Sequence, residues 1–175
     1  MSASPQHVRI VEVGARDGLQ NEKAILPAAT KVELIDRLSD TGLDTIEATS
    51  FVSPKWVPQL ADAADVYTAI RKKAGVRYPV LVPNLQGYER ARAVGVTDIA
   101  VFSAASEAFN RKNINASIDE SIERFMPVME RARADGVSVR GYVSTVLGCP
   151  YQGDVPVTDV VRVAKRLHEI GRAHV

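Results

Sequence analysis

The chain has 175 residues, of which 46% are hydrophobic and 25% are charged, and its net charge is +1. These values fit one globular domain, and they exclude a bulk charge of the kind that recruits nucleic acid or an anionic membrane. No apolar run approaches the ~20 residues of a membrane span, the tail at residues 1–7 lacks signal- or transit-peptide character, and the single cysteine allows no internal disulfide. We therefore expect a cytoplasmic protein.

Helical stretches and short apolar strands alternate along the chain. The first strand is expected over Val8–Val13, which reads as a buried apolar run. After it, a helical stretch repeatedly ends at a glycine and an apolar strand follows, and glycine suits the left-handed residue just past a helix end. The glycines and their strands are Gly42 before Thr45–Glu47, Gly75 before Tyr78–Val82, Gly95 before Asp98–Phe102, and Gly136 before Val139–Val143.

The helices between these strands are amphipathic. Ser117 and Glu120 have the spacing of a capping box at the start of the fourth helix. Pro127 predicts a kink in that helix, whereas Pro156 suits the first turn of the fifth. The apolar faces comprise Ile118, Ile122, Phe125 and Met129 in the fourth helix, and Val160, Val163, Ala164 and Leu167 in the fifth.

Strand–helix units in succession predict an α/β fold with parallel strands and right-handed crossovers. Two architectures fit: an open doubly wound sheet, or part of an eight-stranded barrel to which this chain would contribute about five units. No G-x-G-x-x-G motif follows the first strand, so the dinucleotide-binding form of the open sheet loses its best support.

Polar residues follow every predicted strand, at the edge where α/β proteins build their active sites. The first strand leads into Arg16-Asp17-Gly18-Leu19-Gln20, a charged motif that is costly to half-bury unless it is paired or binds a ligand. A metal ion with an acidic substrate would suit it. The later strands lead into Glu47, Thr49 and Ser50, then Asn84, then Ser103, Ser106, Glu107 and residues 110–113, and finally Ser144, Thr145 and residues 148–150.

A structural interpretation of these residues stays open from spacing alone. Asp17-Gly18 is a common turn pair, and Glu47 could be a buried ion-pair partner of Arg16. For other residues the structural interpretation is preferred. We expect His7 and His168 to lie on the surface and Trp56 to anchor its loop. We expect Cys149 to be inert, because nothing nearby in the sequence lowers the pKa of its thiol.

Several segments carry a family signature: Val11–Glu22, Ile46–Gln59, Tyr78–Leu85, Ala105–Phe109, Lys112–Asn115, Val139–Ser144 and Gly148–Tyr151. Together they resemble the hydroxymethylglutaryl-CoA lyase family from about Val8 to about Ile170. The short R-D-G-x-Q element is shared with a wider superfamily of metal-dependent lyases and Claisen-type synthases. Phe51–Gln59 and Lys112–Asn115 are far more specific to the lyase.

The resemblance implies a (β/α)8 (TIM) barrel that cleaves 3-hydroxy-3-methylglutaryl-CoA to acetyl-CoA and acetoacetate with the help of Mg²⁺ or Mn²⁺. It assigns Asp17 to the metal and Arg16 to the substrate and its enolate. Glu47 would hold this arginine and a metal-bound water, so Arg16 and Glu47 are the expected catalytic residues. The expected substrate-binding residues are Arg16, Gln20, Asn113 and Ser144. The implied partner is a small acyl-CoA substrate, with no nucleic acid or membrane, and the full-length protein is expected to form a homodimer.

The same resemblance implies that residues 8–170 are the N-terminal part of a lyase domain. The family takes its other metal ligands and its catalytic cysteine from later segments, so we expect the chain alone to be inactive and Cys149 not to be that cysteine. Residues 171–175 are expected to be a non-native tail, because residues 170–175 match one reading frame of a sequencing adapter. The alternatives are a Claisen-type synthase, such as an isopropylmalate or homocitrate synthase, and a non-catalytic half-barrel that pairs with another chain.

Overall fold

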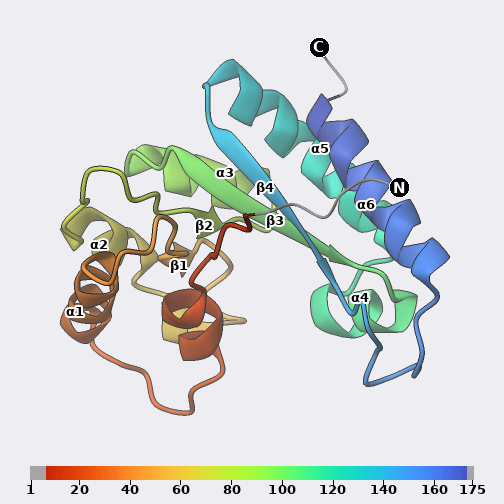
Figure 1. Cartoon of the computed structure of the whole chain (residues 1–175), viewed down its shortest axis with the longest axis horizontal. Helices are drawn as coiled ribbons and strands as arrows, with labels where there is room; N and C mark the ends of the chain where they lie inside the picture. Colours follow the sequence, from red (N-terminus) through yellow and green to blue (C-terminus); the bar gives the residue numbers. More distant parts are fainter. Residues whose placement is uncertain (1–6, 173–175) are drawn as a thin grey trace. The chain divides into compact units, whose positions relative to one another are not determined.

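The computed structural model of the chain describes residues 7–172 (Figure 1). It is an α/β structure in which the hydrogen-bonded strand order follows the sequence, β1-β2-β3-β4. The chain divides into two compact units, residues 1–80 and 81–175, at the middle of β2 (Val80–Leu81). The predicted alternation of helices and parallel strands is therefore confirmed.

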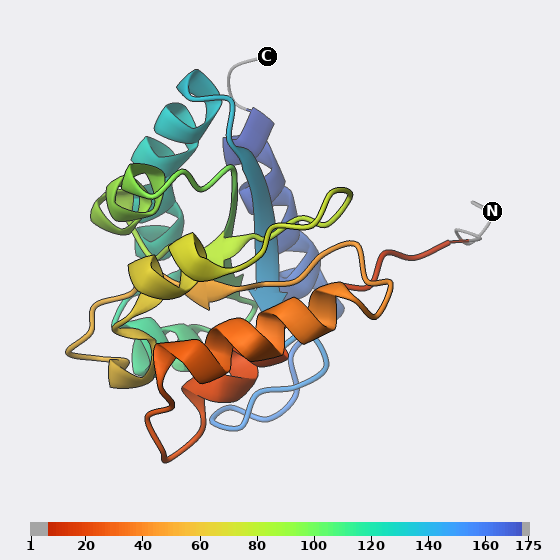
Figure 2. The same ribbon diagram turned by 90° about the vertical axis from the view of Figure 1, so that its left-hand side faces the viewer.

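The first unit contains the charged motif and two packed helices. Its regular elements are the π-helix η1 (Gly14–Gly18), α1 (Ala28–Ser39), β1 (Thr49–Ser50), the 3₁₀-helix η2 (Pro58–Leu60) and α2 (Ala63–Ala69). α1 and α2 lie against each other in Figures 1 and 2. Parallel bridges join Glu12 to Ile46 and Thr45 to Arg77, so the predicted strand at Thr45–Glu47 pairs on both sides.

The second unit is built around a long parallel strand pair. Its elements are α3 (Leu85–Ala93), β3 (Asp98–Ala104), α4 (Glu107–Ile114), α5 (Ile118–Ala134), β4 (Ser138–Ser144) and α6 (Val157–Arg172). β3 and β4 pair in register from Asp98 with Ser138 to Ala104 with Ser144. α6 packs along β4 and against α5 (Figures 1 and 2). The buried faces of these helices supply Ile118, Ile122, Phe125, Val163 and Leu167 to the core.

Local signals in the sequence predicted the helix ends of this unit well. Gly95 and Gly136 follow the C-caps of α3 and α5 with φ of 80° and 67°, the left-handed conformation that favours glycine. At the start of α5 the Ser117 hydroxyl accepts from the Glu120 N–H at 3.0 Å, and the Glu120 carboxylate accepts from the Ser117 N–H at 2.6 Å. The two hydrogen bonds confirm the capping box, and hydrogen bonding of the Glu120 carboxylate to the backbone and side chain of Ser117 lowers the pKa of Glu120 below its ordinary value.

The expected strand over Val8–Val13 is wrong as a buried strand. Only Glu12 pairs with the sheet, donating to the Thr45 carbonyl and accepting from the Glu47 N–H. Val8 and Ile10 are 80% and 66% exposed, because within residues 7–172 this segment has a strand neighbour on one side only. The apolar side chains of Val8 and Ile10 are therefore exposed beside the strand at Thr45–Glu47, although their composition predicted burial.

Other boundaries also differ from expectation. The segment after the first strand is the π-helix η1 rather than a loop, and α4 was not predicted as a helix. α6 begins at Val157, so Pro156 precedes its first turn, and α6 continues through Gly171 to Arg172 instead of ending at the glycine. Of the predicted tail at residues 171–175, residues 173–175 lie outside the described residues, as do residues 1–6 of the N-terminal tail. The origin of residues 171–175 stays a prediction.

Candidate active site

The charged motif forms a single π-helical turn immediately after Val13. The N–H groups of Arg16 and Asp17 donate to the Val13 carbonyl at 3.1 and 2.7 Å. Single π-turns are frequent at functional sites because they change the direction of neighbouring side chains. Here the turn places the arginine and the aspartate next to each other at the end of the segment that pairs with Ile46.

Arg16 is held between two carboxylates. Its Nε donates to Oε1 of Glu47, and its Nη1 donates to Oδ1 of Asp17 at 2.8 Å. The Glu47 side chain is fully buried and that of Arg16 is 11% exposed. A buried carboxylate needs a paired charge, so the predicted ion pair is confirmed. The pairing also fixes the direction of the guanidinium, which a catalytic arginine requires.

Asp17 has the exposure of a ligand-binding carboxylate. Its side chain is 54% exposed, and its main-chain carbonyl accepts from Asn21 Nδ2 at 2.7 Å, which steadies the turn. Carboxylate oxygen is a hard ligand of the kind that Mg²⁺ and Mn²⁺ prefer. Within residues 7–172, however, no group of three or more histidine, cysteine, aspartate or glutamate residues could hold a metal ion. Asp17 therefore fits as one metal ligand, not as a complete site.

Two buried oxygen atoms of the first unit lack a hydrogen-bond partner among the described residues. They are Oε1 of Gln20, in the residues that follow η1, and Oγ of Ser50, in β1. A buried polar atom without a partner costs about 1–3 kcal/mol, and each such atom calls for an explanation such as a ligand or an ordered water. Gln20 was predicted to bind substrate, and its orphaned oxygen is consistent with that role.

Sequence reasoning missed Glu12. Its carboxylate turns onto the motif and accepts from the Gly14 N–H at 2.5 Å. A Cβ on residue 14 would lie 2.7 Å from Oε1 of Glu12, so the glycine makes this approach possible. The alternation of side chains along the segment could have placed Glu12 on the same face as Gly14, but not its contact with the backbone.

Several polar residues after β3 have structural roles. Asn110 is fully buried, donates to the Ser117 carbonyl at 3.1 Å and to Ser121 Oγ at 3.2 Å, and accepts from the Ala104 N–H. Ser103 Oγ lies 2.9 Å from Ser121 Oγ in the same network. This network joins α4 and α5 to β3, so Ser103 and Asn110 were correctly placed at the strand end but their groups are used internally.

The other two predicted substrate-binding residues lie in the second unit. Asn113 is exposed near the end of α4. Ser144 ends β4 and is partly exposed, and its carbonyl accepts from the Ala105 N–H at 2.9 Å. Thr145 follows with φ of 61°, an unusual value for a β-branched residue. The roles of Asn113 and Ser144 stay predictions.

A family model described as HMGL-like matches residues 7–175. The chain belongs to the HMGL-like family. It is 57% identical over 169 residues to the mitochondrial hydroxymethylglutaryl-CoA lyase of Gallus gallus, covering 97% of this chain and 57% of that protein. It is 59% identical over 167 residues to the cytoplasmic 3-hydroxy-3-methylglutaryl-CoA lyase of Mus musculus, covering 95% of this chain and 49% of that protein. The chain thus spans about half the length of the curated relatives it matches.

Solved structures of HMGL-like relatives are also similar to this chain. The hydroxymethylglutaryl-CoA lyase of Pseudomonas aeruginosa matches with a TM-score of 0.91 and 57% identity, covering 95% of this chain and 56% of that one. An HMG-CoA lyase from Acinetobacter baumannii, solved with coenzyme A and 3-methylmalate, matches with a TM-score of 0.90 and 33% identity, covering 98% and 56%. The fold is accordingly that of a partial (β/α)8 barrel, as predicted.

Cys149 of this HMGL-like chain lies in a small apolar cluster with Ala105 and Val155, yet its sulfur accepts hydrogen bonds that the sequence analysis did not predict. Burial raises the pKa of its thiol, but hydrogen bonds from the Ser106 hydroxyl and from backbone N–H groups of Tyr151, Gln152 and Phe109 outweigh burial and lower it. Ser106 Oγ lies 3.0 Å from the sulfur and also 2.7 Å from Oε1 of Gln152. The reason for expecting an inert thiol was therefore wrong, although Cys149 is only 6% exposed.

The expected surface positions of His7 and His168 are confirmed. Trp56 is 86% exposed, so the expectation that it anchors its loop by burial is wrong. Lys31 does that work instead, because its buried ammonium donates to the Gln59 carbonyl and to Asp62 at 2.6 Å. These contacts join η2 and the start of α2 to α1.

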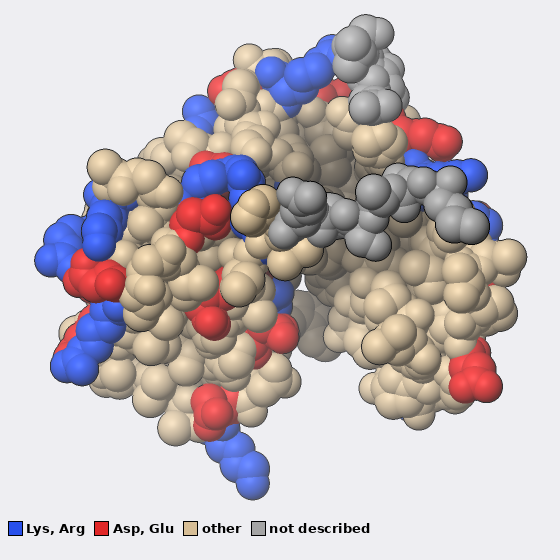
Figure 3. Space-filling model, in the orientation of Figure 1, with Lys and Arg blue, Asp and Glu red and all other residues tan. Residues whose placement is uncertain are grey.

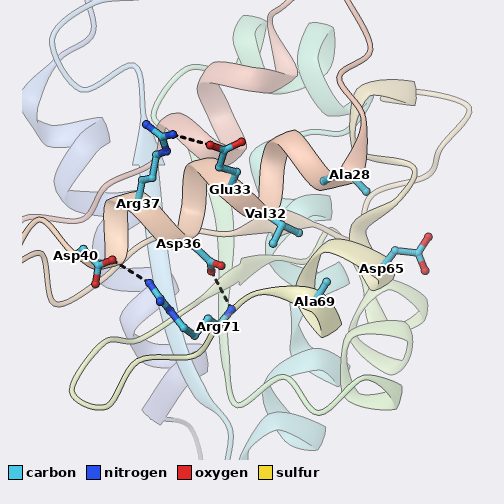
Figure 4. A pocket seen from close by; sticks show the side chains of 10 residues that line it. Ala28, Val32, Glu33, Asp36, Arg37, Asp40, Asp65, Ala69 and Arg71 are labelled. Atoms are coloured by element: carbon cyan, nitrogen blue, oxygen red, sulfur yellow. Dashed lines mark hydrogen bonds and ion pairs between the residues drawn. The ribbon is translucent and has the colours of Figure 1, made fainter.

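A pocket of about 640 Å³ in the first unit of the HMGL-like fold has no residue of the charged motif in its lining, and Figure 4 shows the side chains that form it. It is lined by small apolar residues of α1 and α2 and by paired charges. Arg37 contacts Glu33 at 2.7 Å, and Arg71 contacts Asp40 at 2.9 Å. The hydrogen bond and charge of Lys73, with those of Arg71, hold the pKa of Asp40 below its ordinary value. The Arg37–Glu33 pair lies within α1, whereas the Arg71–Asp40 pair joins the end of α1 to the residues that follow α2.

Two further features of the chain are the distribution of its charged side chains and the hydropathy of its helices. Acidic and basic side chains are interspersed on the face shown in Figure 3, without one large patch of either sign. Within residues 7–172, no helix has the length and apolar character needed to cross a membrane. Relatives of this family are named both mitochondrial and cytoplasmic.

Proposed function

We propose that the chain is part of an acyl-CoA lyase that cleaves 3-hydroxy-3-methylglutaryl-CoA to acetyl-CoA and acetoacetate. The observation that carries this proposal is the arrangement of Arg16 between buried Glu47 and half-exposed Asp17. Membership of the HMGL-like family and identities of 57–59% to proteins named as this lyase support it. The cytoplasm remains the proposed compartment.

In this proposal Arg16 stabilises the charge that develops during cleavage. Breaking the carbon–carbon bond leaves a thioester enolate, and a guanidinium held in advance toward the enolate oxygen stabilises it without reorganisation. Glu47 fixes the guanidinium through Nε. The orphaned oxygen of Gln20 would accept a hydrogen bond from the substrate, and Asn113 and Ser144 would supply further contacts.

Asp17 would hold a divalent cation, Mg²⁺ or Mn²⁺, through its exposed carboxylate. Such a cation, when bound, would polarise the substrate hydroxyl and favour loss of its proton. One carboxylate cannot build a tight site, so we expect the 175-residue chain to bind the cation weakly and to show no measurable lyase activity. Acetoacetate release by the purified chain at a rate near that of a full-length relative would contradict this expectation.

The function is best tested in a chimera. Residues 8–170 would replace the matching segment of the Pseudomonas aeruginosa lyase, to which the chain is 57% identical. We expect the chimera to release acetoacetate within about tenfold of the parent rate, and Arg16→Gln to lower kcat by at least about 100-fold. Arg9→Gln, at an exposed ion pair, is the matched control and should leave the rate unchanged.

The same chimera discriminates between cleavage and condensation. A folded chimera that does not cleave the substrate, but condenses acetyl-CoA with a 2-oxo acid, would favour the Claisen-type synthase. A folded chimera inactive in both assays would contradict the proposed function. The acyl-CoA substrate class is supported by the relative solved with coenzyme A.

A further inference from the structure

Glu12 lies two residues before the turn that carries the charged motif. Its main chain pairs with the sheet, because its N–H donates to the Thr45 carbonyl at 3.0 Å and its carbonyl accepts from the Glu47 N–H at 2.8 Å. Its side chain turns instead toward the backbone of η1, where Oε1 accepts from the Gly14 N–H at 2.5 Å. Glu12 therefore connects the sheet to the first residue of η1.

The Gly14 N–H needs an acceptor from outside the turn. The first N–H groups of a helical turn have no partner within it, and an N-cap side chain usually accepts from one of them. The N-cap of η1 is Val13, whose apolar side chain makes no capping hydrogen bond. The Glu12 carboxylate takes that role from one residue further back, and an ionised acceptor makes the stronger hydrogen bond.

This hydrogen bond bears on the positions of Arg16 and Asp17. Both residues donate their N–H groups to the Val13 carbonyl, at 3.1 and 2.7 Å, and this carbonyl belongs to the same peptide group as the Gly14 N–H. Because a peptide group is planar, an acceptor that fixes the N–H also fixes the direction of the carbonyl. The Glu12 carboxylate thus sets the direction in which η1 leaves the sheet.

Glu12 and Glu47 hold two ends of one residue. Their main chains are joined by a hydrogen bond of 2.8 Å. From this paired backbone, the Glu47 side chain contacts Nε of Arg16, and the Glu12 side chain fixes the turn from which Arg16 projects. Gly14 permits the second contact, since a Cβ there would lie 2.7 Å from Oε1 of Glu12. Two carboxylates from neighbouring segments therefore hold both the guanidinium and the backbone of Arg16.

We propose that Glu12 is a positioning residue for Arg16 and acts through the hydrogen bond to the Gly14 N–H. This inference rests on the proposed function, in which Arg16 stabilises the enolate. The required feature of Glu12 is an acceptor oxygen, because its partner is a backbone N–H. Glutamine, which keeps a side-chain oxygen, should therefore replace Glu12, whereas methionine, of similar length but without an oxygen, should not.

The chimera that carries residues 8–170 tests this role in cleavage. We expect Glu12→Met to lower kcat at least about tenfold and to leave KM within about threefold, because the enolate charge develops only in the transition state. Glu12→Gln should keep kcat within about threefold of the parent chimera. In the Arg16→Gln background, Glu12→Met should lower kcat by less than about threefold more, since the residue that it positions is already absent. Glu33→Met, at an exposed ion pair of α1, is the matched control and should leave kcat unchanged.

Urea unfolding of the 175-residue chain tests the same contact without catalysis. If Glu12 holds the turn of Arg16, replacing Glu12 weakens the contacts that Arg16 makes. The factor by which Arg16→Met raises the unfolding equilibrium constant should then be at least about threefold smaller in the Glu12→Met background than in the wild type. In the Glu33→Met background this factor should be unchanged. Circular dichroism checks that each variant is folded.

The two sets of measurements separate this proposal from the proposed function. In an active chimera, the proposal would be overturned if Glu12→Met kept its kcat, if Glu12→Gln lost as much kcat as Glu12→Met, or if the losses from Glu12→Met and Arg16→Gln multiplied. Additive effects of Glu12→Met and Arg16→Met on unfolding would overturn it as well. A folded parent chimera without lyase activity would contradict the proposed function, and the urea measurements would then decide whether Glu12 positions Arg16.

Discussion

Loss of the Arg16–Glu47 ion pair should strongly destabilise the first unit. Arg16→Met removes the cation that contacts a fully buried carboxylate, and removing one partner of a buried pair costs about 3–5 kcal/mol of unfolding free energy. Glu47→Gln should cost less, about 2–3 kcal/mol, because Arg16 keeps Asp17 at 2.8 Å and some contact with solvent. Arg16→Met, which retains the buried Glu47 carboxylate, should therefore lower the free energy of unfolding more than Glu47→Gln, which retains Arg16.

Urea unfolding followed by circular dichroism measures these costs in the wild-type chain, both single variants and the Arg16→Met/Glu47→Gln double variant. The double variant leaves neither buried charge, so it should cost less than the sum of the single variants by at least about 1 kcal/mol. Arg9→Met is the matched control, because the exposed Arg9–Asp44 pair should contribute at most about 0.5 kcal/mol. Additive costs, or an Arg16→Met cost no larger than that of Arg9→Met, would refute the reasoning.

Three further predictions concern stability. Burial and a hydrogen bond to Asp135 raise the pKa of Tyr88 to about 12. The unfolded chain therefore loses the tyrosine proton at a lower pH than the folded chain, so the free energy of unfolding of the wild type should fall between pH 10 and pH 12. Urea titrations at pH 11 should show a fall of about 1 kcal/mol relative to Tyr88→Phe. Gly136→Ala should lower the free energy of unfolding by about 1 kcal/mol in the same assay, because a φ of 67° is unfavourable for alanine. The cost should be no larger, because open space surrounds the added methyl group. Lys31→Met should cost about 2–3 kcal/mol because it leaves the partly buried Asp62 unpaired, and an unchanged unfolding midpoint would contradict this.

The sequence predicted those parts of the fold that depend on local rules. Helix ends at Gly95 and Gly136 and the cap at Ser117 follow from backbone geometry and short-range hydrogen bonds, which neighbouring residues determine. The strand expected over Val8–Val13 depends instead on partners far away in the sequence. A run of apolar residues indicates that a segment can be buried, but a ladder forms only where other strands lie beside it.

The candidate site divides in the same way. The clustering of polar groups at strand ends was predictable from parallel topology, and the structure brings Arg16, Asp17 and Glu47 into contact, while their roles stay predictions. The internal use of Asn110 was not predictable, because its partners come from α5 and β3 in directions that spacing does not specify. The hydrogen bonds to the Cys149 sulfur likewise include one from Ser106, which is remote in sequence. Pattern therefore locates a polar group, while tertiary packing decides whether it remains available.

For Arg16 the structural and the catalytic interpretations support each other. A free arginine side chain carries about 2 kcal/mol of rotamer entropy, and a ligand that captures it must offset that cost. Glu47 engages Nε and Asp17 engages Nη1, so the guanidinium plane is fixed before any ligand arrives. Neither of these two contacts uses Nη2, and this donor lies in a plane that its partners already define. A buried ion pair that contributes to stability is thus also the means by which an arginine can be held ready for a developing negative charge.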